Sequence, residues 1–139
     1  MDRLIFDSRN SQYKTPFGAV PCGRPITLTL FPPADCAGGC LVAHLEFAGQ
    51  TLEYPLSPVS GDEGYTVTYP APAEPELIWY CFRLERRDGS QVWLGKNGLC
   101  GEGQAACWQQ TVYDDTLSTP EWFGKGVTYQ IFPDRFHRT

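Results

Sequence analysis

Six cysteines are the residues of this sequence whose possible chemistry depends most on spacing. Cys36-x3-Cys40 has a separation that zinc fingers allow, but Cys100-x6-Cys107 is too open to complete a zinc ribbon. A disulfide within either pair is the alternative, and the redox compartment decides between a disulfide and free thiols. We expect six free thiols that fill small sites, and no metal or other cofactor. The cysteines are Cys22, Cys36, Cys40, Cys81, Cys100 and Cys107.

The acidic residues and histidines do not form a pattern typical of a catalytic centre. His44 and His137 are the only histidines, and neither has a serine or cysteine partner at a spacing that indicates nucleophilic catalysis. His44 lies on the polar side of an alternating segment, so we expect it in solvent. We therefore predict no catalytic residue. The carboxylates considered lie in expected loops or at strand ends: Asp7, Asp62, Glu63, Asp114 and Asp115.

The elements that position these residues are predicted by alternation of apolar and polar side chains. Residues 26–30, 41–47 and 65–69 alternate with period two, which is typical of half-buried strands. A tight connection near Gly49 leads to a further alternating segment at 52–56 and indicates a hairpin. Residues 4–7 predict a short first strand, and residues 108–114 predict the last one.

The longest predicted strand covers residues 77–87. On one side Ile78, Tyr80, Phe82 and Leu84 are all apolar, so this side is expected to face the core. The other side begins with apolar residues and turns polar near its end. Asp88-Gly89 follows, which is a strong hairpin signal, and residues 91–94 would form the returning strand.

Composition supports an all-β fold of the immunoglobulin-like β-sandwich class, with about seven or eight strands. The 139 residues include 14 glycines and 12 prolines, which favours many short strands over long helices. A hydrophobic content of 42% and an aromatic content of 14% are enough for a packed core. No amphipathic helix and no internal repeat is visible.

Charge and hydrophobicity exclude several partners. The net charge is -5, from 16 acidic and 11 basic residues, which argues against nucleic acid as a partner. No apolar run is long enough to cross a membrane. The first residues have no apolar segment of signal-peptide length, so a cytoplasmic location is expected.

The last part of the sequence carries the most specific motif. Val127-Thr-Tyr-Gln-Ile-Phe-Pro-Asp-Arg-Phe136 resembles the first barrel strand of glycoside hydrolase family 13, closest to neopullulanases, cyclomaltodextrinases and maltogenic amylases. Four further segments resemble, in the same order, the N-terminal domain of that group. The resemblance therefore spans nearly the whole chain. The segments are Phe6-Asp-Ser-Arg9, Tyr13-Lys-Thr-Pro-Phe-Gly-Ala-Val20, Trp79-Tyr-Cys-Phe-Arg-Leu84 and Thr111-Val-Tyr-Asp114.

The resemblance implies a division of the chain into three parts. Residues 1–114 would be an N-terminal β-sandwich domain, residues 115–126 a linker, and residues 127–139 the truncated first strand of a (β/α)8 barrel. The family's catalytic carboxylates come from later barrel strands, so Asp134 is expected to be structural. The calcium loop that commonly follows the motif does not follow Phe136. Residues 127–132, separated from a barrel, are expected to pair with a free sheet edge of this chain or of a second copy.

The resemblance also suggests sugar binding. A glucan presents flat apolar faces and a rim of hydroxyl groups, so a site needs exposed aromatic rings with amide or carboxylate partners. Candidates off the predicted core faces are Trp93, Trp79 and Tyr65, with Asn97 near Trp93. Core packing is the alternative for each of the rings. Trp108 is expected to be buried, and Trp122 to pack the linker against the barrel.

We therefore expect a non-catalytic N-terminal domain of an α-glucan-acting hydrolase, one that cleaves α-1,4 and α-1,6 glucosidic bonds. The expected ligand is an α-glucan or a cyclodextrin, bound weakly. The alternatives are a dimerisation and substrate-gating domain, or a purely structural domain with no sugar binding. The expected protein partners are the chain's own barrel domain and a second copy in a homodimer.

Overall fold

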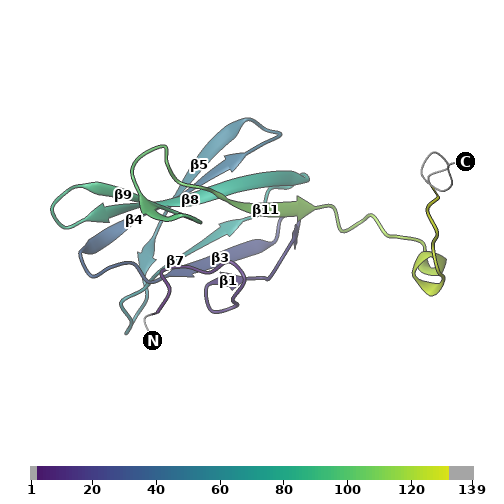
Figure 1. Ribbon diagram of the computed structural model, residues 1–139, viewed down its shortest axis with the longest axis horizontal. Coiled ribbons are helices and arrows are strands. Elements are labelled where there is room, and N and C mark those ends of the chain that lie inside the picture. Colours follow the sequence, from purple (N-terminus) through teal and green to yellow (C-terminus); the bar gives the residue numbers. More distant parts are fainter. Residues whose placement is uncertain (1–2, 132–139) are drawn as a thin grey trace, which may run out of the picture.

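The computed structural model describes residues 3–131 and shows two β-sheets packed face to face (Figure 1). The seven longest strands are those that alternation predicts, so the predicted all-β sandwich is confirmed; its immunoglobulin-like classification stays a prediction. The remaining four strands have two or three residues each. The elements are β1 (Lys14–Thr15), β2 (Val20–Pro21), β3 (Pro25–Leu30), β4 (Cys36–Leu45), β5 (Gln50–Pro55), β6 (Ser57–Pro58), β7 (Tyr65–Pro70), β8 (Glu76–Arg86), β9 (Gln91–Gly95), β10 (Gly98–Cys100), β11 (Trp108–Tyr113) and the 3₁₀ helix η1 (Glu121–Lys125).

The smaller sheet has the strand order β1-β3-β7-β6, and its centre is the antiparallel pair β3 and β7. On β3 the side chains of Ile26, Leu28 and Leu30 are fully buried, because alternation turns all three toward the other sheet. The threonines between them face outward. Thr27 Oγ1 lies 2.9 Å from Thr68 Oγ1, which links the two strands on their outer face.

The larger sheet is built around β8, which has neighbours on both sides. Strand β4 pairs with β8 along one side, and β5 continues the sheet beyond β4. The other side of β8 is shared: β9 pairs with its second half and β11 with its first half. Strands β9 and β11 therefore meet end to end beside the middle of β8, where Lys96 N donates a hydrogen bond of 2.7 Å to Ala106 O.

The core lies between the two sheets. The side of β8 that carries Ile78, Tyr80, Phe82 and Leu84 is at most 1% exposed, as alternation predicts. Burial of each such side chain contributes about 1.5–3 kcal/mol to folding. An aromatic cluster extends the core, with Trp108 stacked on Tyr80 at a centroid distance of 5.8 Å.

The N-terminal segment differs from the prediction, because Leu4–Asp7 forms no strand. Ile5 O accepts one backbone hydrogen bond, from Phe31 N at 2.8 Å, which is not a ladder. The segment is held by its side chains instead: the Phe6 ring lies 4.8 Å from Trp108 and 5.1 Å from Phe82, edge to face. It covers one end of the core without extending a sheet.

After β11 the chain leaves the sandwich and runs to η1, away from both sheets (Figure 1). Within residues 3–131, residues 127–131 form no strand and pair with no edge of either sheet, contrary to the expectation that this segment pairs with an edge of its own chain. Residues 132–139, including Asp134 and His137, lie outside the described residues. The domain boundaries at 114 and 126 stay predictions. No helix among the described residues has the length and apolarity that a membrane crossing requires.

Candidate functional site

The outer face of the larger sheet brings two of the predicted site residues together. Trp79 lies on β8 between His44 of β4 and Gln109 of β11, and Trp93 lies on β9 opposite Arg83 of β8. Both tryptophans are partly exposed. Trp79 and Arg83 are four residues apart on one strand, so roughly 13 Å separates the two tryptophans along the strand direction.

Trp79 is surrounded by groups that can form hydrogen bonds. Its indole Nε1 donates to Glu46 Oε2 over 3.1 Å. His44 is exposed, as predicted, and its Nδ1 lies 3.0 Å from Thr51 Oγ1. These groups are placed by β4 and β5, whose hairpin brings residues 46 and 51 to the same face as Trp79.

Trp93 lies beside an ion pair. Arg83 donates to both carboxylate oxygens of Glu53, over 2.8 and 3.0 Å, in a bidentate geometry. The hydrogen bond to Glu53 raises the pKa of the Arg83 guanidinium, although burial opposes this shift. The guanidinium carbon is 5.9 Å from the centroid of the Trp93 ring. The pair therefore presents fixed charged donors and acceptors next to an aromatic ring.

The other two predicted site residues are not part of this face. Tyr65 lies on β7 of the smaller sheet, beside a hollow of about 150 Å³ that also contacts Glu63 and Arg87. Asn97 lies in the turn between β9 and β10. Its Nδ2 donates to Gln104 O over 2.9 Å and its Oδ1 accepts from Ala106 N over 2.9 Å. The Asn97 amide therefore holds the loop of residues 101–107 in place.

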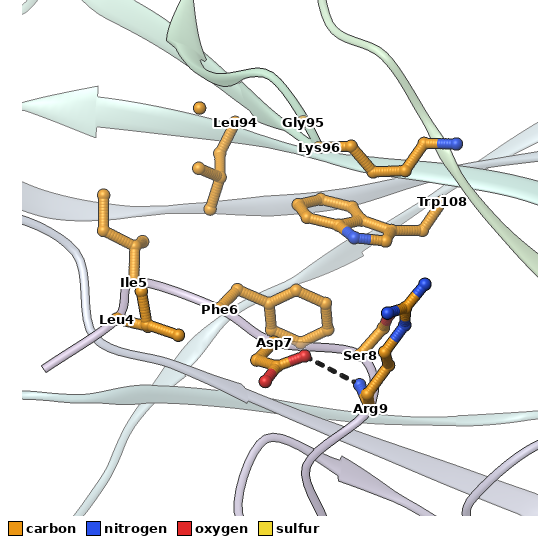
Figure 2. A pocket seen from close by; sticks show the side chains of 11 residues that line it. Leu4, Ile5, Phe6, Asp7, Ser8, Arg9, Leu94, Gly95, Lys96 and Trp108 are labelled. Atoms are coloured by element: carbon orange, nitrogen blue, oxygen red, sulfur yellow. Dashed lines mark hydrogen bonds between the residues drawn. The ribbon is translucent and has the colours of Figure 1, made fainter.

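A larger hollow lies at the N-terminal segment, and sequence reasoning did not find it. It has a volume of about 470 Å³ and lies between residues 4–9 and the end of β9 (Figure 2). The side chains of Lys96 and Arg9 flank Trp108 in this view, and Asp7 Oδ1 accepts a hydrogen bond from Arg9 N at 2.9 Å. The available signal was the polar run Asp7-Ser-Arg9 directly after Phe6.

This hollow is less suited to a sugar than the outer face of the larger sheet. Trp108 is only 9% exposed and stacks on Tyr80, so little of its ring is free to contact a ligand. The prediction that Trp108 is buried is confirmed. The hollow is therefore mainly the open end of the core, with Arg9 and Lys96 at its rim.

All six cysteines lie within the described residues, and all are free thiols. Neither of the disulfides considered from the sequence, Cys36–Cys40 or Cys100–Cys107, is present. Burial raises the pKa of the Cys36 and Cys40 thiols, which lowers their reactivity near neutral pH. In the part of the chain that the structure describes, no three His, Cys, Asp or Glu side chains are arranged to hold a metal ion.

The chain is similar over nearly its whole length to amylopullulanases. It is 31% identical over 148 residues to the amylopullulanase of Thermoanaerobacter thermohydrosulfuricus, and 30% identical over 149 residues to that of Thermoanaerobacterium thermosulfurigenes. These alignments cover 97% and 98% of this chain but 10% and 8% of the relatives. Neopullulanase 2 of Thermoactinomyces vulgaris is 38% identical over 62 residues, which is 42% of this chain and 11% of that protein.

These relatives confirm the resemblance that the motifs indicate. The chain is homologous to one short region of amylopullulanases and of a neopullulanase, which are glycoside hydrolases of family 13. It spans about a tenth of the length of the curated relatives it matches. No family model matches the chain.

Proposed function

We propose that this chain is a non-catalytic β-sandwich domain of an α-glucan-acting glycoside hydrolase, and that it binds α-glucan weakly. The site would be the outer face of the larger sheet, around Trp79 and Trp93. The observation that carries this proposal is that two partly exposed tryptophans share one sheet face with a bidentate Arg83–Glu53 pair. Homology to amylopullulanases supports the glucan as the ligand class.

The arrangement suits a chain of sugar units better than a single sugar. Each tryptophan ring can pack against the flat apolar face of one glucose unit. Because the two rings are roughly 13 Å apart along the strand, one glucan would contact them with non-adjacent units. Arg83, Glu53 and Glu46 lie beside the rings and can form hydrogen bonds with the hydroxyl groups between.

The same face is poorly suited to hydrolysis. Cleavage of a glycosidic bond requires one protonated carboxyl group and one carboxylate on opposite sides of the bond. Glu46 and Glu53 are instead hydrogen-bonded to Trp79 and Arg83 on the same outer face of the larger sheet. We therefore expect no hydrolase activity from this chain; α-1,4 and α-1,6 cleavage would belong to the whole enzyme.

The experiment is a titration of the chain with maltoheptaose and β-cyclodextrin, followed by calorimetry and tryptophan fluorescence. We expect saturable binding in the micromolar to millimolar range. Trp79→Ala and Trp93→Ala should each weaken binding about two- to tenfold, since one stacked ring contributes about 0.5–1.5 kcal/mol. Trp122→Ala is the matched control, because Trp122 is exposed but lies beyond the sandwich. Absence of heat and of spectral change up to millimolar ligand would contradict glucan binding.

A second function, docking to another domain, is favoured by a different observation. The segment after β11 carries several large apolar side chains that the sandwich leaves exposed. A barrel domain of the same protein, as the family resemblance implies, or a second copy could cover them. These residues are Leu117, Trp122, Phe123, Val127, Tyr129 and Ile131. We also propose a cytoplasmic location, which the six free thiols suit.

A further inference from the structure

Two of the free thiols face each other at the centre of the larger sheet. Tyr80 of β8 is paired with Trp108, the first residue of β11, and both point to the core. Continued by one residue beyond its last pair, this antiparallel register places Cys107 opposite Cys81, with both side chains on the opposite, outer face and within hydrogen-bonding reach of each other. This place is the junction where the end of β9 meets the start of β11.

The register brings the two cysteines within the range that a disulfide requires. Directly opposed residues of antiparallel strands have Cα atoms about 4.5–5.5 Å apart, and disulfides need about 4.4–6.8 Å. The other thiols of this face are engaged differently. Cys100 Sγ donates to Trp93 O over 3.5 Å, and Cys40 lies on the far side of β8, opposite Arg83.

The two thiols differ in their surroundings. Cys81 is 6% exposed, and burial together with the neighbouring Cys107, whose thiol is within hydrogen-bonding reach, raises the pKa of the Cys81 thiol to about 12. Cys107 is more exposed, and its Sγ donates to Ala105 O over 3.8 Å. A reagent in solution therefore reaches Cys107 before Cys81.

We propose that Cys81 and Cys107 form a two-thiol reaction site that a low-molecular-weight disulfide converts into a cross-strand disulfide. The Cys107 thiolate attacks one sulfur of the reagent, which leaves a mixed disulfide on Cys107 and releases one small thiolate that takes a proton from solvent. Cys81 then loses its proton to solvent, and its thiolate attacks the Cys107 sulfur and expels the second small thiolate, which is protonated in turn; the raised pKa of Cys81 makes this second step the slower one. Two protein thiols are oxidised and one reagent disulfide is reduced, so electrons and protons balance.

The new bond would join the middle of β8 to the start of β11. It would close the segment between residues 81 and 107, which includes β9, β10 and the loop of residues 101–107. Closing a loop of this length restricts the unfolded chain. We expect the melting temperature of the oxidised protein to rise by about 5 °C or more relative to the reduced protein.

The experiment treats the fully reduced 139-residue chain with oxidised glutathione, then blocks remaining thiols and measures intact mass and a peptide map. We expect a product that carries four blocking groups where the reduced chain carries six, with one cross-linked peptide that contains Cys81 and Cys107. Cys107→Ser should abolish this product. A product without an intramolecular disulfide, or with a disulfide between other cysteines, would overturn the proposal.

Two variants with four substitutions each give a matched comparison. The first keeps Cys81 and Cys107, and the second keeps Cys100 and Cys107; in both, the other four cysteines become alanine. Because the first pair is already opposed, its disulfide should form at least about tenfold faster. Equal rates in folded variants would overturn the proposal. If a variant does not fold by circular dichroism, the peptide map of the unmodified chain still decides.

Discussion

Glu76 shows how one carboxylate holds two parts of the larger sheet together. Glu76 is 6% exposed. Its two carboxylate oxygens accept hydrogen bonds from the backbone N–H groups of Phe47, Ala48 and Leu77 at 2.8–3.1 Å. Burial acts to raise the pKa of this carboxyl group, but the three N–H donors outweigh it and the pKa is lowered. Glu76 therefore fixes the β4–β5 turn against the start of β8.

Substitution of Glu76 should make the free energy of unfolding less dependent on pH in the acidic range. At neutral pH Glu76→Gln should lower the free energy of unfolding by about 1–3 kcal/mol. The glutamine NH₂ group is a donor, so it would leave at least one of the backbone N–H groups without an acceptor. The native carboxylate has a lowered pKa, so its contribution is complete above the ordinary value of 4.5 and is lost as pH falls through the native pKa. The difference between wild type and variant should therefore shrink below about pH 4.5.

Urea unfolding of both proteins between pH 7 and pH 3 checks this prediction. Glu74→Gln is the control, since Glu74 is exposed and should leave stability unchanged at every pH. A constant difference across the pH range would show that hydrogen bonding to the charged form is not the cause.

Gly95 marks the close approach of β9 and the loop that precedes β11. A Cβ atom there would lie 2.7 Å from both the N and the O atoms of Ala106. Gly95→Ala should therefore lower the free energy of unfolding by about 1–3 kcal/mol, as other overpacked sites do. Gly124→Ala is the control, since its Cβ would meet no heavy atom within 4 Å. Thermal unfolding of both variants decides, and an unchanged melting temperature for Gly95→Ala would contradict the tight junction.

For single residues, the sequence predicted the direction of a side chain better than the partners it binds. Alternation placed Trp79 outside and Trp108 inside, because a strand offers only two directions. It could not reveal that the Asn97 amide binds Gln104 and Ala106, because those partners come from a loop seven to nine residues later. A polar residue near an aromatic ring in sequence is therefore weak evidence for a binding site.

Among the elements, β8 determines the stability of the larger sheet. It pairs with β4 along one side and with β9 and β11 along the other, and its inner side chains are fully buried. Opening β8 would break three strand pairings at once. We therefore expect its backbone amides to exchange with deuterium more slowly than those of the edge strands β5 and β10. Hydrogen exchange with mass spectrometry measures this, and equal rates in β8 and β10 would contradict it.

The elements that alternation found and those it missed differ in length and pairing. Six of the seven long strands have buried side chains, and in β5 half-buried Leu52 and Tyr54 alternate with exposed residues, so their sequences carry a period of two. Strands β1 and β2 have two residues each, which is too few for any period to be visible. Leu4–Asp7 has the apolar content of a strand but is held by the packing of Phe6, which a pattern cannot distinguish from pairing.

The candidate site was only partly predictable, because a sequence pattern indicates contacts between neighbouring segments but not contacts between distant ones. Trp79 and Trp93 come together because β8 and β9 form a hairpin, which Asp88-Gly89 signals locally. The hollow beside Trp108 joins residues about ninety positions apart in the sequence, from the N-terminal segment and from β9 to β11. The polar run Asp7-Ser-Arg9 marks one side of this hollow, but no local pattern encodes its contact with the other side.

Across the described molecule, apolar side chains are buried in the core of the sandwich but exposed in the segment after β11. Val127, Tyr129 and Ile131 are 81%, 84% and 65% exposed, whereas the inner side chains of the sandwich are almost completely buried. Alternate residues of an extended segment point the same way, so all three can form one apolar edge. Such an edge is a typical site of association with another chain or domain.

Replacing all three side chains should therefore change assembly without changing the fold. We expect the unmodified chain to associate with itself as concentration rises, and Val127→Ser/Tyr129→Ser/Ile131→Ser to shift it toward the monomer, as measured by light scattering after size exclusion. The melting temperature should stay within about 1 °C, because these side chains are outside the core. A loss of several degrees would mean that the segment packs on the sandwich. A monomer at every concentration of the unmodified chain would instead limit this apolar edge to contacts with a different partner, such as a barrel domain.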